Sequence, residues 1–145
     1  MRQAPKSSTR RAAAQAEGKN GSPLRTARLT LRVDFGAFGY LGPGKIALME
    51  LIETHGSISA AGKEMDMSYR RAWLLVEEIN RIFREPLVEK QMGGTGGGGA
   101  RLSALGRDVV RRYRAIEAAA ASAATADLKA LKAALAERPA QTEAQ

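Results

Sequence analysis

Residues 56–99 contain the segment that most restricts what this chain can fold into. Two stretches with helical hydrophobic spacing, about 59–65 and 68–84, are separated by the short turn Asp66-Met67. A run of six glycines and one threonine follows at 93–99, which indicates a flexible loop between two strands. Two short helices joined by a tight turn, with a glycine-rich loop after them, are typical of a helix-turn-helix with a β wing.

The helix that precedes this segment is expected over residues 45–55, close behind Pro43, a residue favoured at helix starts. Gly56 ends it, because glycine readily adopts the left-handed conformation that closes a helix. Either Ser57 or Ser59 can cap the next helix by accepting a bond from a backbone N–H group. The sequence therefore predicts a helix, a tight corner and a second, short helix.

The short helix is unusually rich in small residues, which would let the following helix cross it closely: Ala60, Ala61 and Gly62. Asp66 stands in the turn, where it is one of the few non-glycine residues that tolerate the left-handed region. Ser68 caps the third helix, which runs to about Arg84 and stops before Pro86. Its apolar positions recur every three or four residues, as in an amphipathic helix.

Strands are expected on either side of these helices. Residues 29–35 alternate apolar and polar side chains, which predicts a strand with one apolar face formed by Leu29, Leu31, Val33 and Phe35, followed by a loop at 36–44. Residues 87–92 and 100–102 are expected to form the two strands of the wing. The predicted fold class is mainly α, a winged helix-turn-helix with a small β wing.

A long helix is expected from Ser103 to about residue 138, joined in its middle by alanine-rich sequence of high helix propensity. Such a helix would span roughly 50 Å, too long to bury its far half on so small a domain. We therefore expect it to be a dimerisation helix, packing on a second copy through Leu105, Val109, Tyr113, Ile116, Leu128, Leu131 and Leu135.

The positive charge is unevenly distributed along the chain. Residues 1–28 carry seven Lys and Arg against one Glu, residues 29–114 carry thirteen against ten acids, and residues 115–145 carry three against four. The expected domains are a disordered basic arm at 1–28, the winged helix-turn-helix at 29–102, the long helix at 103–138 and a disordered tail at 139–145. A basic balance suits a polyanion such as nucleic acid, or a solvated tail.

The residue inventory argues against several other classes of protein. The chain has no cysteine and one histidine, His55, without an acid cluster or a nucleophile-base pair, so we expect no metal site and no enzyme. No apolar run approaches the roughly 18 residues of a membrane span. The glycines at 94–99 formally match a dinucleotide-binding fingerprint, but they lie between strands rather than at the start of a helix. Trp73 is interpreted as a core or helix-packing residue.

The first turn of the third helix would enter the major groove of DNA if the motif binds DNA. Arg70 and Arg71 stand there, and an arginine can bind a guanine through two parallel hydrogen bonds. Tyr69 can contact a phosphate or a thymine methyl group. Further candidate contacts to the DNA backbone are Ser57, Ser59, Ser68, Lys90, Gly96, Gly97 and Arg101. The alternative is that residues 69–71 form only a solvated first turn, although cations there oppose the helix dipole.

Five segments together resemble the DNA-binding domain of the ModE family of molybdate-responsive transcriptional regulators: 56–61, 67–73, 87–89, 93–102 and Gly106. The similarity extends over roughly residues 29–118. The order serine, tyrosine, basic residue, Ala72 and Trp73 at the start of the third helix, together with the glycine-rich wing, is more specific than a general helix-turn-helix. LysR-type regulators share the architecture but usually lack this combination.

The resemblance implies a homodimer that binds a palindromic operator in double-stranded DNA and controls genes for molybdate uptake or molybdenum enzymes. It also implies a cytoplasmic, nucleoid-associated protein. Full-length members carry oxyanion-binding domains after the long helix, and because this sequence stops soon after that helix, no molybdate cofactor is expected. Two alternatives stay open: a chromosomal protein that binds DNA without sequence preference, and a module that binds a partner protein through the helix-turn-helix face.

Overall fold

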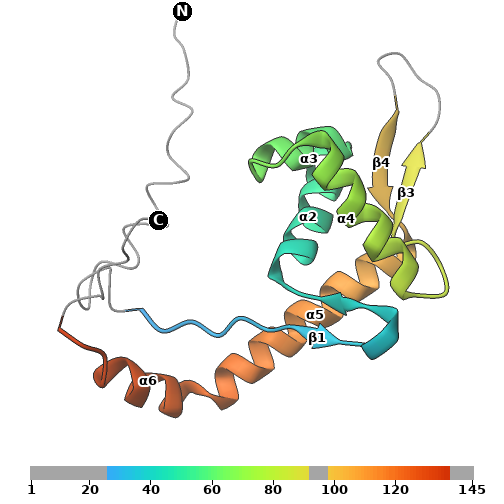
Figure 1. Ribbon diagram of the computed structural model, residues 1–145. Coiled ribbons are helices and arrows are strands. Elements are labelled where there is room, and N and C mark those ends of the chain that lie inside the picture. Colours follow the sequence, from blue (N-terminus) through green and yellow to red (C-terminus); the bar gives the residue numbers. More distant parts are fainter. Residues whose placement is uncertain (1–25, 92–97, 138–145) are drawn as a thin grey trace, which may run out of the picture. The chain divides into compact units, whose positions relative to one another are not determined.

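The computed structural model describes residues 26–91 and 98–137, and the arrangement of these parts is shown in Figure 1. Contacts divide the chain into two units, one over residues 29–122 and one formed by the residues before and after it. Three predicted features lie outside the described residues: the arm up to residue 25, Gly96 and Gly97 of the wing, and the tail at 139–145.

Three helices form the body of the larger unit, and they are α2 (Pro43–His55), α3 (Ile58–Glu64) and α4 (Tyr69–Ile82). α3 packs against both α2 and α4, with α4 crossing beside the wing in Figure 1. The described residues form mainly helices with two small antiparallel strand pairs. The predicted fold class, a mainly helical winged helix-turn-helix, is confirmed.

Side-chain caps and left-handed residues set the corners between these helices, as the sequence predicts. Gly56 adopts a φ of 72° at the end of α2, and Asp66 a φ of 53° in the turn. Ser57, rather than Ser59, caps α3, because its Oγ accepts the N–H of Ala60 at 2.9 Å. The Oγ of Ser68 accepts the N–H of Arg71 at 3.1 Å and so caps α4.

Gly62 shows why α3 needs small residues. It is buried, and a Cβ atom added to it would lie 3.0 Å from the Cβ of Ala72 on α4. That separation is shorter than an ordinary carbon-carbon contact, so a larger residue would push the two helices apart. The predicted close crossing is therefore present in the structure.

The first strand is shorter than the sequence predicts. Only β1 (Val33–Asp34) is a strand, and it pairs with β2 (Tyr40–Leu41), which lies in the predicted loop together with the short 3₁₀ helix η2 (Gly36–Phe38). The apolar alternation is nevertheless present, because Leu29, Leu31, Val33 and Phe35 are all half-buried between exposed neighbours. Alternating burial does not require hydrogen bonds to a neighbouring strand, and residues 29–32 pair with no strand among the described residues.

The wing consists of β3 (Val88–Gln91) and β4 (Gly99–Leu102), paired antiparallel with Val88 opposite Leu102 and Lys90 opposite Ala100. Four apolar residues are buried in the same core as α2, α3 and α4: Leu87, Val88 and Leu102 at the base of the wing, and Ala100 farther along β4. This burial joins the base of the wing to the helical body.

The C-terminal helix is not continuous, which corrects the prediction of one helix from Ser103 to residue 138. α5 (Ala104–Ala123) ends before Ala124, and α6 (Thr125–Ala133) begins after it. Ala124 has a φ of −94° and a ψ of 3°, outside the helical range. Ser122 and Thr125 flank the break, and both have lower helix propensity than the alanines around them.

Candidate nucleic-acid interface

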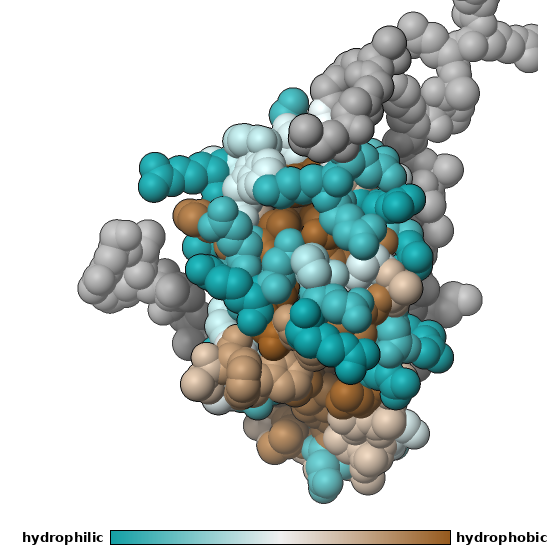
Figure 2. All heavy atoms as spheres, turned by 90° about the vertical axis from the view of Figure 1, so that its right-hand side faces the viewer, coloured by the Kyte–Doolittle hydropathy of each residue, from teal (hydrophilic) through white to brown (hydrophobic). Residues whose placement is uncertain are grey.

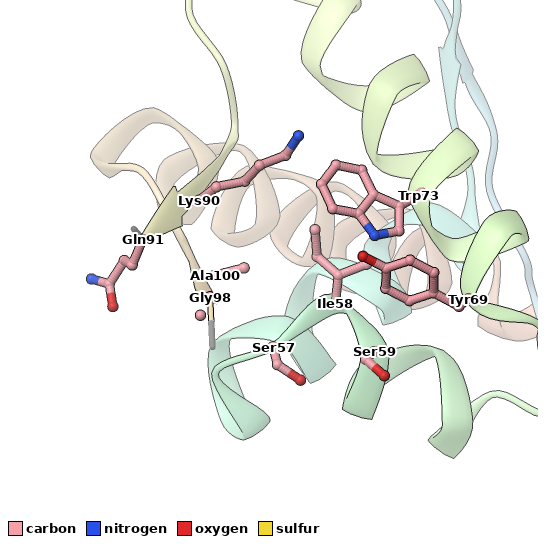
Figure 3. A pocket seen from close by; sticks show the side chains of 10 residues that line it. Ser57, Ile58, Ser59, Tyr69, Trp73, Lys90, Gln91, Gly98 and Ala100 are labelled. Carbon is pink, nitrogen blue, oxygen red and sulfur yellow. The ribbon is translucent and has the colours of Figure 1, made fainter. Parts of the chain in front are cut away.

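Residues from α3, α4 and the wing surround one hollow with a volume of about 260 Å³. Figure 3 shows Ser57 and Ser59 on one side of it, Tyr69 and Trp73 on another, and Lys90 reaching across from β3. None of the described residues that line it carries a carboxylate. The polar side-chain groups that line the hollow are therefore hydroxyls, an amide and an ammonium group, a set rich in hydrogen-bond donors.

The first turn of α4 is open to solvent, as a groove-reading surface requires. The side chain of Tyr69 is 59% exposed, and Arg70 and Arg71 are exposed as well. Within the described part of the chain neither arginine forms an ion pair, so both guanidinium groups are available to a ligand. Ser57 and Ser68 use their oxygens as acceptors for caps, which leaves each O–H free to donate.

The four arginines on α5 contrast with Arg70 and Arg71 on α4, because their guanidinium groups pair with carboxylates of the same unit. Arg107 pairs with Glu53 at 3.4 Å, and Arg114 pairs with Glu50 and Glu117, which raises the pKa of its guanidinium. Hydrogen bonds from Arg112 and Arg111 lower the pKa of the Asp108 carboxyl. These pairs tie α5 to α2 or to its own neighbouring turns, so the unpaired positive charge of α4 stands out from that of α5.

Trp73 is a residue of α4, and its side chain contacts the wing. The ammonium of Lys90 sits 3.7 Å from the centre of its ring, and the Tyr69 ring packs edge-on against it at 5.8 Å between centroids. Its Nε1 is buried and has no hydrogen-bond partner among the described residues. In Figure 3 the indole nitrogen lies on the side of Tyr69 and Ile58. Trp73 is half-buried and packs against the core, as the sequence predicts, but its contact with Lys90 was not predicted.

Two hydrogen bonds attach β4 to the end of α2. The N–H of Ala100 donates to the carbonyl of Gly56 at 2.8 Å, and the N–H of Leu102 donates to Oε2 of Glu53 at 2.9 Å. A Cβ atom on Gly99 would lie 3.1 Å from that same Gly56 carbonyl. The last glycine of the run therefore permits a close approach of backbone to backbone, which a larger residue would resist.

Asn80 and Ser103 hold the other side of the wing, and sequence reasoning gave neither of them this role. The Asn80 side chain accepts the N–H groups of Leu87 and Val88 at 3.0 and 2.9 Å and donates to the Val88 carbonyl at 3.1 Å. Ser103 is buried, and its Oγ donates to the Pro86 carbonyl at 2.7 Å. A polar residue on the otherwise apolar face of the predicted helix was the available signal for Asn80.

The two basic residues predicted for the wing lie on opposite faces of it. Lys90 faces Trp73, whereas Arg101 pairs across the strands with Glu89, their side chains 3.5 Å apart. Successive side chains of a strand alternate between its faces, so the Arg101 side chain cannot share the hollow with Lys90. The structure thus brings Ser57, Ser59, Tyr69 and Lys90 together and leaves Arg101 apart from them.

The predicted dimer residues divide into two groups. Tyr113 is 2% exposed, and Leu105 and Val109 are half-buried against the core of their own chain. The hydroxyl of Tyr113 donates to the Leu31 carbonyl at 2.6 Å. Tyr113 therefore belongs to the core of its own chain. Three other predicted contacts are exposed, Ile116, Leu131 and Leu135, and Leu128 is half-buried.

An apolar surface also lies away from the hollow. Phe35, Phe38, Ile82, Phe83 and Leu105 line a second hollow of about 430 Å³, and Phe38 is 72% exposed. On the face drawn in Figure 2, hydrophilic side chains cover most of the upper part and a hydrophobic area lies toward the lower edge. None of the described helices is both long enough and apolar enough to span a membrane.

No protein-family model matches the chain. It is 42% identical over 91 residues to the molybdenum transport protein ModE of Azotobacter vinelandii, an alignment that covers 63% of this chain and 33% of that protein. It is 38% identical over 85 residues to the DNA-binding transcriptional dual regulator ModE of Escherichia coli K12, covering 59% of this chain and 32% of the relative. The chain is homologous to the N-terminal region of ModE.

The molybdenum-pterin-binding protein MopA of Rhodobacter capsulatus is 38% identical over 79 residues, covering 54% of this chain and 30% of MopA. The chain thus spans about a third of the length of these relatives. The resemblance predicted from the helix-turn-helix and wing motifs is confirmed, and it concerns the region that corresponds to one part of ModE.

Proposed function

We propose that this chain is the DNA-binding part of a transcriptional regulator and that it binds a two-fold-symmetric operator as a homodimer. The observation that carries the proposal is the donor-rich hollow, where serines of α3, Tyr69 of α4 and Lys90 of the wing meet without a carboxylate. A phosphodiester backbone presents acceptors and negative charge, which this set of groups complements. Homology to ModE regulators supports the same function.

Each group has a distinct part in the proposed complex. Arg70 and Arg71 enter the major groove at the N-terminal end of α4 and read base edges, because a guanidinium can bond guanine O6 and N7 together. Tyr69, the serine hydroxyls and Lys90 contact phosphates and set the register of the helix in the groove. Arg101 contacts the DNA backbone from the other face of the wing. Gly96 and Gly97, which lie outside the described residues, are proposed as further backbone contacts because glycine permits a close approach.

A homodimer accounts for the two-fold symmetry of the proposed operator. The exposed apolar side chains Ile116, Leu131 and Leu135 provide the contact between copies, with Leu128. Two copies related by a two-fold axis would read half-sites one helical turn, about 34–36 Å, or a multiple of it apart. In this proposal the regulated genes are those of molybdate transport or of molybdenum enzymes, and the protein acts at the chromosome in the cytoplasm. The name of one relative, a molybdenum transport protein, supports the link to molybdenum transport.

The test is a selection from genomic DNA. The purified protein is incubated with fragments of its own genome at near-physiological salt, and the bound fragments are sequenced, with and without molybdate. Enrichment of a two-fold-symmetric site upstream of metal-transport genes is the expected result. A change with molybdate would mean that the chain itself binds the oxyanion.

Two other results would contradict the proposal. Uniform recovery of fragments would identify a chromosomal protein without sequence preference, whose binding weakens steeply with salt. Absence of DNA binding even at low salt would identify a module that binds a partner protein through the same face.

A further inference from the structure

Trp73 contacts one group from each of the two elements that the proposed function places on DNA. On α4 it lies one helical turn after Tyr69, whose ring packs edge-on against it. From the wing, Lys90 places its ammonium over the indole face at 3.7 Å from the ring centre. Indole is the strongest of the aromatic side chains in such cation–π contacts.

Most of the hydrogen bonds between the wing and the helical body, among the described residues, lie at the base of the wing. Asn80 and Ser103 bind backbone at residues 86–88, and Glu53 binds the N–H of Leu102. One backbone bond, from Ala100 to Gly56, lies farther along β4. Beyond the base, the contact between Lys90 and Trp73 joins β3 to α4 through side chains.

Lysine has a long, flexible side chain, and holding it in one place normally costs side-chain entropy. Stacking on a half-buried indole restricts the Lys90 side chain before any ligand is present. The Tyr69 ring is restricted on the other edge of the same indole. A preorganised pair of groups binds a phosphate with less loss of entropy than two freely moving groups.

The indole nitrogen adds a second observation. A buried N–H without an acceptor is unfavourable in a folded protein and calls for an explanation. Trp73 Nε1 has no partner among the described residues, although a phenylalanine at this position would avoid the cost. Retaining indole is consistent with a need for its larger and more electron-rich face.

We infer, on the basis of the proposed function, that Trp73 is a positioning residue that holds Lys90 of the wing and Tyr69 of the recognition helix as one unit against the DNA backbone. Trp73 itself does not contact a base. Its effect on DNA binding passes through Lys90, so the two residues must act non-additively.

The test is a double-mutant cycle on binding to a labelled duplex of the strongest genomic fragment, measured over a range of salt concentrations. In the wild-type chain, Lys90→Met should lower the slope of log affinity against log salt by about 1, the loss of one phosphate contact. In a Trp73→Leu background the same Lys90 substitution should leave the slope unchanged. An equal change of slope in both backgrounds would overturn the inference.

Matched controls separate positioning from general damage. Lys129→Met removes one exposed lysine from α6, and its effect should be the same with and without Trp73. Leu74→Ala removes an exposed apolar side chain from the residue next to Trp73, and the effect of Lys90→Met should persist in that background. Circular dichroism and thermal unfolding report the fold of each variant.

If Trp73→Leu does not fold, Trp73→Phe decides the question. The smaller ring gives a weaker cation–π contact, so Lys90→Met should reduce affinity by a smaller factor than in the wild type. An equal factor would overturn the inference. A wild-type chain that binds no duplex would overturn the proposed function as well, whereas additive effects in a chain that binds DNA would overturn only the role of Trp73.

Discussion

Individual residues fix where α4, the proposed recognition helix, begins and which side chains its first turn exposes. Ser68 caps α4 through its Oγ, so the helix begins at Tyr69 and its next two residues, Arg70 and Arg71, fall in the exposed first turn. Two cations in a first turn oppose the helix dipole, and they are not compensated by ion pairs within the described residues. An anionic partner would compensate them.

Arg71→Ala should reduce specific DNA affinity by about 1–3 kcal/mol and relax the preference at one base pair of each half-site. The helical circular dichroism signal should not change, since the side chain is exposed. Arg81→Ala, at the other end of the same helix, is the matched control. Equal losses for the two variants, measured by fluorescence anisotropy on operator and random duplexes, would contradict a base contact by Arg71.

Because Tyr113 is buried, we expect the stability of the chain to depend on pH. Burial raises the pKa of its phenol above the ordinary value of 10.0, because the charged form is poorly solvated there. The neutral phenol is therefore favoured in the folded chain. Its contribution is fully present below the pKa of the unfolded chain and is lost as the pH rises through the folded pKa.

Tyr113→Phe removes the hydrogen bond to the Leu31 carbonyl and should cost about 1 kcal/mol of unfolding free energy near pH 7. The difference from the wild type should shrink above the ordinary tyrosine pKa, where the wild type alone loses stability through this group. Urea unfolding, carried out near pH 7 and above the ordinary tyrosine pKa, measures this difference in unfolding free energy. A difference that stays constant with pH would show that the phenol does not control this dependence.

At the scale of elements, the wing is positioned by contacts at its base. Asn80 of α4 satisfies three backbone groups at residues 87 and 88, and Gly106 at the start of α5 packs directly on the Leu87 backbone. These contacts join α4, the wing and α5 at one point. The orientation of the wing relative to α4 therefore depends on residues that do not face the hollow.

Gly106→Ala tests that junction. An added Cβ would overlap the carbonyl oxygen of Leu87, so we expect a loss of about 1–3 kcal/mol in stability from overpacking. Gly44→Ala is the control, because a Cβ there meets no atom within 4 Å. The control should leave the chain as stable as the wild type or slightly more stable. Similar melting temperatures for both variants would contradict the close packing at Gly106.

At the scale of the whole molecule, the proposed function requires a second copy of the chain. The proposed contact uses apolar side chains that are exposed in this chain, of which Leu131 is 64% exposed. The break at Ala124 divides these residues between α5 and α6. The proposed contact therefore draws on two helices of the chain, Ile116 from α5 and Leu128 and Leu131 from α6.

Leu131→Ser combined with Leu135→Ser should convert the dimer to a monomer, as measured by sedimentation at several concentrations. Affinity for a two-fold-symmetric duplex should fall steeply, whereas affinity for an isolated half-site should change little, since the α4 surface is untouched. Phe38→Ser is the comparison, because Phe38 is the exposed residue of the separate apolar hollow. Dissociation by Phe38→Ser alone would assign the dimer contact to that hollow.

Local rules made the helix-turn-helix predictable. Gly56, Ser57, Asp66 and Ser68 act on backbone within a few residues of themselves, so spacing along the chain was sufficient to find the corners. The same holds for Gly62, because an adjacent helix must cross at the small residues. Periodicity also indicated which face of residues 29–35 is turned inward, although not that only Val33 and Asp34 pair as a strand.

Contacts between distant segments could not be predicted in the same way. Capping, turn chemistry and hydrophobic period are local, so the amino-acid sequence was sufficient to predict a winged helix-turn-helix with basic residues in the first turn of its third helix. Three features became apparent only in the folded chain: Lys90 contacts Trp73, Arg101 faces away from the hollow, and Tyr113 is buried in its own chain. These outcomes depend on strand register and on how α5 packs, and both arise from contacts between residues far apart in the sequence.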